Sequence, residues 1–504
     1  MSVQAHTVAF QGMDAKAVEV QCSLSAGLPA FSLVGLPDKA VAESKERVRA
    51  ALNAIGLALP PKRITINLAP ADLPKEGAHY DLPIALSLLT ALEVIPSDET
   101  SRHIAMGELS LDGRIGHVAG ALPAALAAAE ADRGFICPES CGPEAALVGA
   151  AEVLAPATLV ALINHFAGRS ALAAPAPASP TNGEVVGDLA DIRGQESARR
   201  ALEVAAAGAH NLLMIGPPGA GKSMLAKCLP SILPPMDAQE MLEVSMIRSI
   251  AGKLEAGEIA RERPFMDPHH GASGPAMVGG GRRAGPGEIS LAHNGVLFLD
   301  ELPEFASGVL DSLRQPMESG ETLVARANAH VRYPSRFQLV AAMNPCRCGY
   351  LSDPAMACSR APKCGLDYQA RISGPLLDRL DVQIEVPAVR PQDLSNAPKG
   401  EPSAPVAARV AAARTRQAAR FEAMGLPFRT NAELSGDALE HAAAPDAEGR
   451  KLLDTAADKL HLTARGYHRV MRLSRTIADL ADASRVDRSH VAEAIGYRRA
   501  PLKR

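Results

Sequence analysis

The sequence predicts an α/β core in which helices flank a parallel sheet, and three stretches of the chain predict it. Residues 216–223 read Gly-Pro-Pro-Gly-Ala-Gly-Lys-Ser, a complete G-x-x-x-x-G-K-[ST] phosphate-binding loop. An apolar, strand-like run at 212–215 precedes the loop, and a helical pattern at 224–227 follows it. Two further apolar runs, at 296–299 and 337–343, are typical of strands that are buried on both faces of a parallel sheet.

The phosphate-binding loop provides the first set of ligand residues. Its backbone N–H groups would face the phosphates, Lys222 would reach the β- and γ-phosphates, and the Ser223 hydroxyl would ligate Mg²⁺. A chance match would be an ordinary turn before a helix, which the strand–loop–helix context disfavours. We therefore expect ATP and Mg²⁺ as cofactors, with the cofactor-binding residues Gly216, Pro217, Pro218, Gly219, Ala220, Gly221, Lys222, Ser223 and Asp300.

Polar residues follow the other two predicted strands. Asp300 and Glu301 come directly after the run at 296–299, and Asn344 comes directly after 337–343. Because open α/β sheets bind ligands at the C-terminal ends of their strands, we expect Asp300 to hold Mg²⁺, Glu301 to polarise the attacking water and Asn344 to orient it. Each residue taken alone is equally an ordinary strand cap, but their succession behind a phosphate-binding loop favours a catalytic site.

Composition limits the remaining functions. A chain of 504 residues with 47% hydrophobic and 21% charged residues predicts about three globular domains. Aromatic residues make up 3%, Trp is absent and the net charge is −4, so neither a base-stacking surface nor a global basic field is expected. No apolar run reaches the ~18 residues of a membrane span, and the N-terminus lacks a signal-peptide pattern. We expect no membrane partner and a cytoplasmic location.

Changes in composition along the chain predict the domain boundaries. A Pro/Ala stretch without periodicity reads as a semi-extended linker at 168–184, which separates a first domain at 1–167 from the α/β core at 185–392. Residues 393–504 are Ala- and Arg-rich with helical periodicity, and they predict a helical lid. Three stretches of the core read as insertion loops, and the third is expected to form a β-hairpin: 268–273, 279–283 and 320–335.

Five motifs together resemble the magnesium-chelatase-like branch of the AAA+ ATPases, and within it the ComM/YifB family. The resemblance covers essentially the whole chain and is carried by residues 216–223, 263–270, 295–301, 344–346 and 372–381. It implies a ring, usually a homohexamer, with ATP bound between subunits and insertion loops facing a central pore. It also implies a DNA translocase that acts on single-stranded and branched DNA, a branch-migration helicase of natural transformation.

The resemblance assigns roles to several arginines. Arg379 matches the arginine finger that enters the neighbouring subunit's site; a salt bridge with Asp378 or Asp381 is the alternative, and Arg371 is a second candidate for the finger. Arg465 matches the lid arginine that senses the γ-phosphate, and Arg469, one turn later, competes with it. On the insertion loops, contacts with DNA phosphates are expected from Arg282, Arg283, Arg326 and Arg332. His269 and His270 are expected to be loop or packing residues rather than metal ligands.

The N-terminal domain resembles the ribosomal-protein-like fold of Lon protease at residues 75–81 and 107–114. Lon-type proteolysis needs a Ser nucleophile and an activating Lys, but the matching positions hold His79 and Leu122. Peptide hydrolysis is therefore not expected, and the domain is expected to be a rigid collar or a DNA-binding accessory. Three cations of this domain, Lys62, Arg63 and Lys75, could touch phosphates, with solvated surface charge as the default.

Four of the eight cysteines lie close together in the sequence. Cys346, Cys348, Cys358 and Cys364 have the spacing C-x-C-x₉-C-x₅-C, which is not a standard zinc ribbon. A structural Zn²⁺ and free buried thiols beside the active site are both open at this point. A disulfide framework is not expected in a cytoplasmic protein.

Two other functions compete with the DNA translocase. A chelatase-type motor would remodel a protein partner and not DNA, and an ATP-dependent protease would need the nucleophile that is missing at His79. The presence of the Lon-like domain favours the translocase, since chelatase motor subunits lack it. ATP hydrolysis is common to all three functions.

Overall fold

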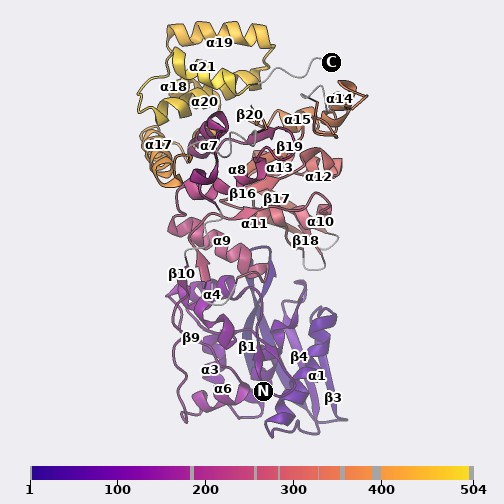
Figure 1. The fold of residues 1–504 in the computed structure, drawn as a ribbon. Coiled ribbons are helices and arrows are strands. Elements are labelled where there is room, and N and C mark those ends of the chain that lie inside the picture. The colour runs from indigo at the N-terminus through magenta and orange to yellow at the C-terminus, as the bar shows by residue number, and fades with distance from the viewer. Residues whose placement is uncertain are drawn as a thin grey trace.

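The structure, a computed structural model, describes residues 3–181, 187–254, 258–281, 284–326, 329–351, 358–388 and 399–498. At 179–181, 258, 260, 326 and 329 it describes the backbone alone. The chain forms three units in a row: an N-terminal α+β domain, an α/β core in the middle and a helical domain at the far end (Figure 1).

A mixed seven-stranded sheet, in the order β3-β4-β2-β1-β5-β8-β9, forms the centre of the N-terminal domain. Its strands are β1 Val3–Gln11, β2 Asp14–Ser25, β3 Ala30–Val34, β4 Arg63–Ala69, β5 His103–Ala105, β8 Gly134–Ile136 and β9 Val153–Leu154, and a separate pair is β6 Glu108–Leu109 and β7 Ile115–Gly116. The helices are α1 Lys39–Ala54, α2 Asp81–Ala91, α3 Ser97–Arg102, α4 Ala121–Glu130, α5 Gly142–Ala145 and α6 Leu159–Phe166. Because side chains alternate along a strand, Ala5 and Ala9 of β1 pack with α1 and α2, whereas Val8 packs with α4.

A five-stranded parallel sheet, in the order β13-β16-β19-β11-β20, forms the core. Its strands are β13 Phe265–Met266, β16 Val296–Leu299, β19 Gln338–Met343, β11 Leu212–Ile215 and β20 Val382–Glu385. The helices of this unit are α7 Glu196–Gly208, α8 Lys222–Cys228, α9 Ala238–Ile250, α10 Gly274–Val278, α11 Glu288–Leu291, α12 Ser307–Ser312, α13 Arg314–Ser319, α14 Lys363–Gln369 and α15 Gly374–Leu377.

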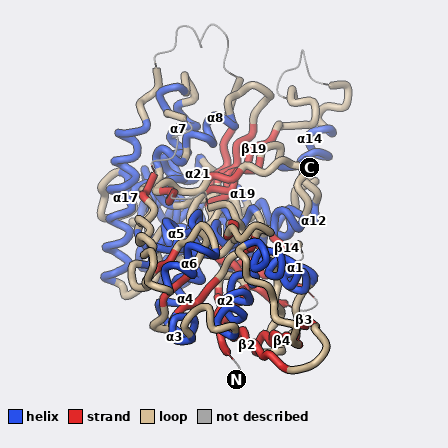
Figure 2. Tube along the Cα trace, turned by 90° about the horizontal axis from the view of Figure 1, so that it is seen from below, coloured by secondary structure: helices blue, strands red, loops and turns tan. Residues whose placement is uncertain are grey.

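Helices cover both faces of the core sheet, and the alternation of buried residues explains why. Leu212 and Met214 pack into a cluster with α7 and α8, whereas Leu213 between them packs into a cluster with α12 and α15 on the opposite face. Figure 2 shows the strands between α7 and α8 on one side and α12 on the other. The predicted parallel sheet with helices on both faces is confirmed.

The insertions form small elements around this core. The hairpin expected at 320–335 is confirmed as β17 Glu321–Arg326 paired antiparallel with β18 Ala329–Pro334. A second small ribbon pairs β14 Gly279–Gly280 with β15 Gly285–Pro286. Within the stretch expected to be a linker, β10 Ser179–Thr181 pairs in parallel with β12 Glu258–Ala260.

The C-terminal unit is helical, as the sequence predicts for a lid. It comprises α17 Ser403–Ala423, α18 Gly436–Ala443, α19 Ala447–Leu460, α20 Ala464–Leu480 and α21 Arg488–Gly496. Apolar side chains of α17 and α20, such as Val410, Leu473 and Ile477, are buried in the same cluster as one face of the core sheet. The lid is thus packed on the core by a shared apolar interior.

The described residues of the N-terminal domain touch the core at helix α9 and at the hairpin. Helix α4 lies against α9, where the Gly120 N–H donates to the carbonyl of Ser249 at 3.0 Å. At the β1–β2 turn, a Cβ on Gly12 would come 2.7 Å from Cγ1 of Val331, so this turn lies directly on the hairpin strand β18. The hairpin therefore has the N-terminal domain as one of its neighbours.

Candidate nucleotide-binding site

The C-terminal ends of three neighbouring strands bring the predicted site residues together. In the sheet order, β16, β19 and β11 are adjacent, and they are followed in the chain by Asp300, Asn344 and Gly216 respectively. All three strands are parallel, so these residues meet at one edge of the sheet. The expected juxtaposition follows from the topology.

The phosphate-binding loop lies close to the backbone that directly follows β20. A Cβ on Gly216 would come 2.1 Å from the carbonyl oxygen of Val386, so only glycine fits there. Gly221 has a φ of +84° and ends the loop where α8 begins with Lys222. Glycine is therefore needed at the entry of this loop for space and at its exit for backbone conformation.

Lys222 points back along its own loop. Its Nζ donates to the carbonyls of Gly216 at 2.8 Å and Pro217 at 3.0 Å, and to Oδ1 of Asn344 at 3.2 Å. The side chain is buried, and this burial lowers the pKa of its ammonium group. The ammonium group thus lies between the loop and the end of β19, within reach of both.

Oxygen ligands meet beside this lysine. The Ser223 hydroxyl donates to Oδ2 of Asp300 at 2.6 Å, and Oδ1 of Asp300 accepts from the Glu301 N–H at 2.8 Å. A hydroxyl and a carboxylate oxygen are hard ligands of the kind that Mg²⁺ takes while keeping several waters. The loop glycines, the lysine and this oxygen pair therefore fit the ATP and Mg²⁺ that the family implies.

Glu301 contacts His270, which the sequence did not predict to lie near it. Glu301 itself has a left-handed backbone, with φ of +53°, and its Oε2 lies 3.1 Å from Nδ1 of His270. His270 also lines a cavity of about 530 Å³ together with Phe305, Glu304 and Arg371. The histidine pair expected to be loop or packing residues thus includes one that contacts the candidate base.

Arg379 follows α15 and is held within its own subunit. Its guanidinium donates to the Pro375 carbonyl at 2.6 Å and forms an ion pair with Glu318 of α13. The expected alternative partners do not bind it, because Asp381 and Asp378 face Arg469 at 3.3 and 4.0 Å. Within the described part of the chain, no hydrogen bond joins Arg379 to the phosphate-binding loop.

The other arginines differ in exposure. Arg371 forms an ion pair with Glu304 at 2.9 Å and is 52% exposed. Arg469 is buried, and burial lowers the pKa of its guanidinium despite Asp381 nearby. Arg465 is exposed on the first turn of α20, whose N-cap is Thr463. Of the two lid candidates, only Arg465 is thus exposed to solvent.

Of the four arginines expected to contact DNA, the structure describes the side chain of Arg332. Arg332 on β18 is 76% exposed and lies 3.6 Å from Glu321 across the hairpin. Arg326 ends β17, and its side chain lies outside the description; Arg282 and Arg283 lie outside the described residues altogether. Arg332 and the hairpin that carries it are therefore the described part of the expected DNA contact.

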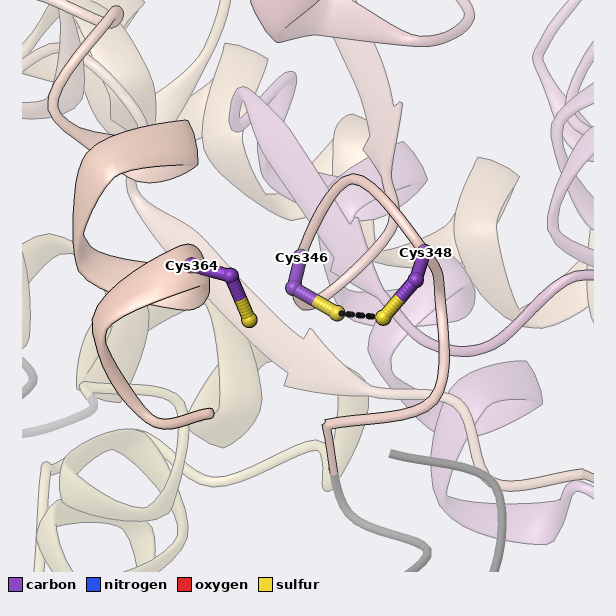
Figure 3. A group of neighbouring side chains, drawn as sticks. All are labelled: Cys346, Cys348 and Cys364. Carbon is purple, nitrogen blue, oxygen red and sulfur yellow. Dashed lines mark hydrogen bonds between the residues drawn. The ribbon is translucent and has the colours of Figure 1, made fainter. Parts of the chain in front are cut away.

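Three of the four clustered cysteines bring their sulfurs together. The Sγ atoms of Cys346, Cys348 and Cys364 all lie within 4.8 Å of one another, and those of Cys346 and Cys348 are 3.1 Å apart (Figure 3). Cys358, the fourth cysteine of the sequence cluster, is not in this mutual group. Hydrogen bonds to the Cys348 sulfur, first that from the backbone N–H of Tyr350 and then that from Cys346, lower the pKa of this thiol to about 6. All eight cysteines are free, and this cluster can hold a metal ion.

The protease-like positions of the N-terminal domain are buried. His79 Nε2 donates to the Val8 carbonyl at 2.9 Å, and its ring lies 4.2 Å from that of Tyr80. Leu122 is fully buried where α4 meets the core. Lys75, a candidate phosphate contact, is fully buried, and its Nζ donates to the Pro70 carbonyl, so it is unsuited to that role.

A phosphate-binding loop, an acidic residue at the end of another strand of the same sheet and a helical lid define a P-loop nucleotide-binding protein. Family models match "Magnesium chelatase, subunit ChlI" at residues 188–394, "Subunit ChlI of Mg-chelatase" at 18–141 and "Magnesium chelatase, subunit ChlI C-terminal" at 400–498. The chain belongs to the ComM/YifB family of magnesium-chelatase-like AAA+ ATPases.

Two relatives match over nearly their full length. The chain is 44% identical to competence protein ComM of Haemophilus influenzae, covering 97% of this chain and 96% of the relative. It is 43% identical to YifB of Escherichia coli strain K12, covering 98% and 96%. The magnesium-chelatase 38 kDa subunit of Rhodobacter capsulatus is 32% identical over 31% of this chain and 49% of its own length. None of the helices that the structure describes is long and apolar enough to cross a membrane.

Proposed function

We propose that the protein is an Mg²⁺-dependent ATPase that uses hydrolysis to translocate on single-stranded and branched DNA. The observation that carries the ATPase is the meeting of Lys222, Ser223, Asp300 and Asn344 at the ends of three adjacent parallel strands. ATP and Mg²⁺ are the cofactors of this activity, with zinc as a structural ion at the cysteine cluster.

The residues of the site divide the chemistry among themselves. Lys222, which lies on the loop carbonyls, would bind the phosphates, and Ser223 with Asp300 would hold Mg²⁺. When bound, Mg²⁺ neutralises charge on the phosphate oxygens. Glu301 takes up the proton of the attacking water, and Asn344, already beside Lys222, orients that water.

A neighbouring subunit completes each site in a homohexameric ring. Arg379 is the proposed finger, and the lack of a hydrogen bond to its own phosphate-binding loop, within the described residues, supports a role in trans. Arg465, exposed at the start of α20, is the proposed γ-phosphate sensor of the lid. Arg469 is unsuited to this role because it is buried against Asp381.

DNA is the proposed partner because of the hairpin and the relatives. Arg332 extends from the solvent-facing side of the two-stranded ribbon and, among the described residues, pairs with one carboxylate, so it is available to a phosphate. The nearly full-length match to a protein named for competence supports a role in natural transformation. For that role we propose branch migration of recombination intermediates in the cytoplasm.

A chelatase-type motor that remodels a protein partner is the second candidate. The family models carry the magnesium-chelatase name, and the Rhodobacter capsulatus subunit is 32% identical. That match covers only 31% of this chain, whereas the ComM match covers 97%, so the observation favours the DNA motor.

ATPase rates with single-stranded, duplex and forked DNA test the choice. We expect stimulation that is indifferent to sequence and falls steeply with salt, because binding to phosphates releases counterions. Combined replacement of Arg326 and Arg332 by Ala should remove stimulation and Holliday-junction migration while sparing the basal rate. Arg49→Ala is the control, since Arg49 is also an exposed arginine beside one carboxylate, at 3.8 Å. A rate that no DNA form changes at any salt, with no junction migration, would favour the chelatase-type motor.

A further inference from the structure

We propose that the four clustered cysteines bind one zinc ion, and that the zinc-bound turn supports the phosphate-binding loop, so that zinc occupancy strengthens nucleotide binding. The metal site stands on the cysteine geometry alone. The coupling rests on the proposed nucleotide site.

The sulfurs are arranged for a metal. Cys346 and Cys348 come from one turn and Cys364 from the first turn of α14, and Figure 3 shows their sulfurs close together in the space between these two segments. In a tetrahedral site with Zn–S bonds of ~2.3 Å, neighbouring sulfurs are ~3.8 Å apart, and the observed mutual limit of 4.8 Å needs only small shifts. Cys358 lies outside this mutual group, but it is the remaining cysteine of the segment and would supply the fourth thiolate.

The turn that carries the first two cysteines lies on the phosphate-binding loop. The Gly349 N–H donates to the Cys346 carbonyl at 3.0 Å and closes the turn. A Cβ on Gly349 would lie 2.5 Å from Cδ of Pro218, the third residue of the phosphate-binding loop. The backbone of this turn is therefore in direct contact with the loop.

The same segment holds the loop at a second point. Asn344 lies two residues before Cys346 and accepts the hydrogen bond from Lys222 at 3.2 Å. Pro345 between them accepts from Gln369 of α14 at 3.0 Å, which connects the segment to the helix that carries Cys364. A metal that joins the turn to α14 would fix both contacts with the phosphate-binding loop, because thiolate ligation contributes folding free energy.

Metal content and nucleotide affinity are measured together on the full-length protein, purified without a His tag. Elemental analysis should give about one zinc per chain, and Co²⁺ exchange should give the absorption bands of a tetrahedral thiolate site. Cys364→Ser should lose the zinc and weaken ATP binding by roughly tenfold. Cys22→Ala, which removes a buried thiol in the N-terminal domain, is the control and should keep both.

Two glycine variants test the effect of the turn on nucleotide binding separately from metal binding. Gly349→Ala should keep the zinc but weaken ATP binding, because its Cβ would displace Pro218. Gly425→Ala is the matched control: Gly425 also has a positive φ, of +64°, but nothing lies within 4 Å of its Cβ. This pair also keeps the proposal testable if Cys364→Ser fails to fold.

The outcomes are distinguishable. Zinc well below one per chain would overturn the metal site. Zinc loss in Cys364→Ser with unchanged ATP affinity, or wild-type affinity in Gly349→Ala, would overturn the coupling. A zinc-loaded wild-type protein that binds no ATP would overturn the proposed function and the coupling, and would leave the metal site standing.

Discussion

The N-terminal domain and the core both place polar residues beside a sheet, but they use them differently. In the N-terminal domain, His79 is buried with its nitrogen bonded to the Val8 carbonyl, and Leu122 fills the other protease-like position. In the core, Lys222 and Asp300 hydrogen-bond to other polar groups of one site at the strand ends. Polar residues stabilise the fold in the first region and form a candidate reaction site in the second.

The difference teaches where substitutions should act. The N-terminal domain is joined to the core through the α4–α9 contact, where the Leu122 N–H and the Ser249 hydroxyl both donate to the buried carboxylate of Glu144. Burial raises the pKa of Glu144, as expected for a group used in packing. Changes in this domain should therefore alter stability, whereas changes in the core site should alter turnover.

The largest effect is expected from Arg379→Ala in the core. As a finger in trans, Arg379 should contribute ~10³–10⁵ in ATP turnover with little contribution to ATP affinity. Steady-state kcat and equilibrium nucleotide binding measure the two separately. Arg371→Ala is the comparison: Arg371 is the second candidate for the finger and, like Arg379, pairs with a glutamate of its own subunit, so it should lose much less if Arg379 is the finger. Equal losses in the two variants would contradict the assignment.

Glu301→Gln should reduce turnover by ~10²–10⁴ and keep ATP binding, because the amide cannot accept the proton of the attacking water. Lys222 and the Ser223–Asp300 pair remain in place for the phosphates and Mg²⁺. Lys222→Ala should instead weaken binding itself. Single-turnover kinetics at saturating ATP distinguish the two, and near-normal turnover of Glu301→Gln would exclude Glu301 as the base.

Substitution of the two lid arginines should affect different properties, ATP turnover for Arg465 and stability for Arg469. Arg465→Ala should lower turnover by about tenfold and leave the free energy of unfolding unchanged, as expected for an exposed sensor. Arg469→Ala should lower the free energy of unfolding by about 3 kcal/mol, because it leaves the buried Asp381 without its ion-pair partner. Chemical denaturation beside ATPase assays checks both, and the reverse pattern would exchange the two roles.

The smallest effect on catalysis is expected in the N-terminal domain. His79→Ala should lower the free energy of unfolding by about 1–3 kcal/mol, because it removes a buried hydrogen bond to Val8 and an aromatic contact. Basal ATP turnover should stay within about twofold of the wild type, and no peptide hydrolysis should be detectable in either protein. A turnover loss as large as that of Glu301→Gln would remove the distinction between the two regions.

The sequence predicted the strand ends because each depends on local pattern. An apolar run followed at once by Asp300 or Asn344 is visible in a few residues, and parallel pairing then brings the two together. The hairpin at 320–335 was predictable for the same reason, since its polar alternation is local.

Contacts made by residues far apart in the chain were not predictable. The contact of His270 with Glu301 depends on how a loop 31 positions earlier folds back on the strand end. The contact of Gly349 with Pro218 depends on a turn after β19. Lys75 is neither a solvated surface charge, the default expectation, nor a phosphate contact, because its ammonium group is buried against the Pro70 carbonyl, which sequence alone does not show.

The most direct test of a site completed between subunits mixes Arg379→Ala with Glu301→Gln protein. Each variant alone should be nearly inactive. In mixed rings, an interface is intact where a subunit that keeps Glu301 meets a neighbour that keeps Arg379. Random assembly of equal amounts makes about a quarter of the interfaces intact. We predict that ATP turnover rises well above that of either variant at intermediate ratios. Turnover that stays at the level of the separate variants at every ratio would contradict the account.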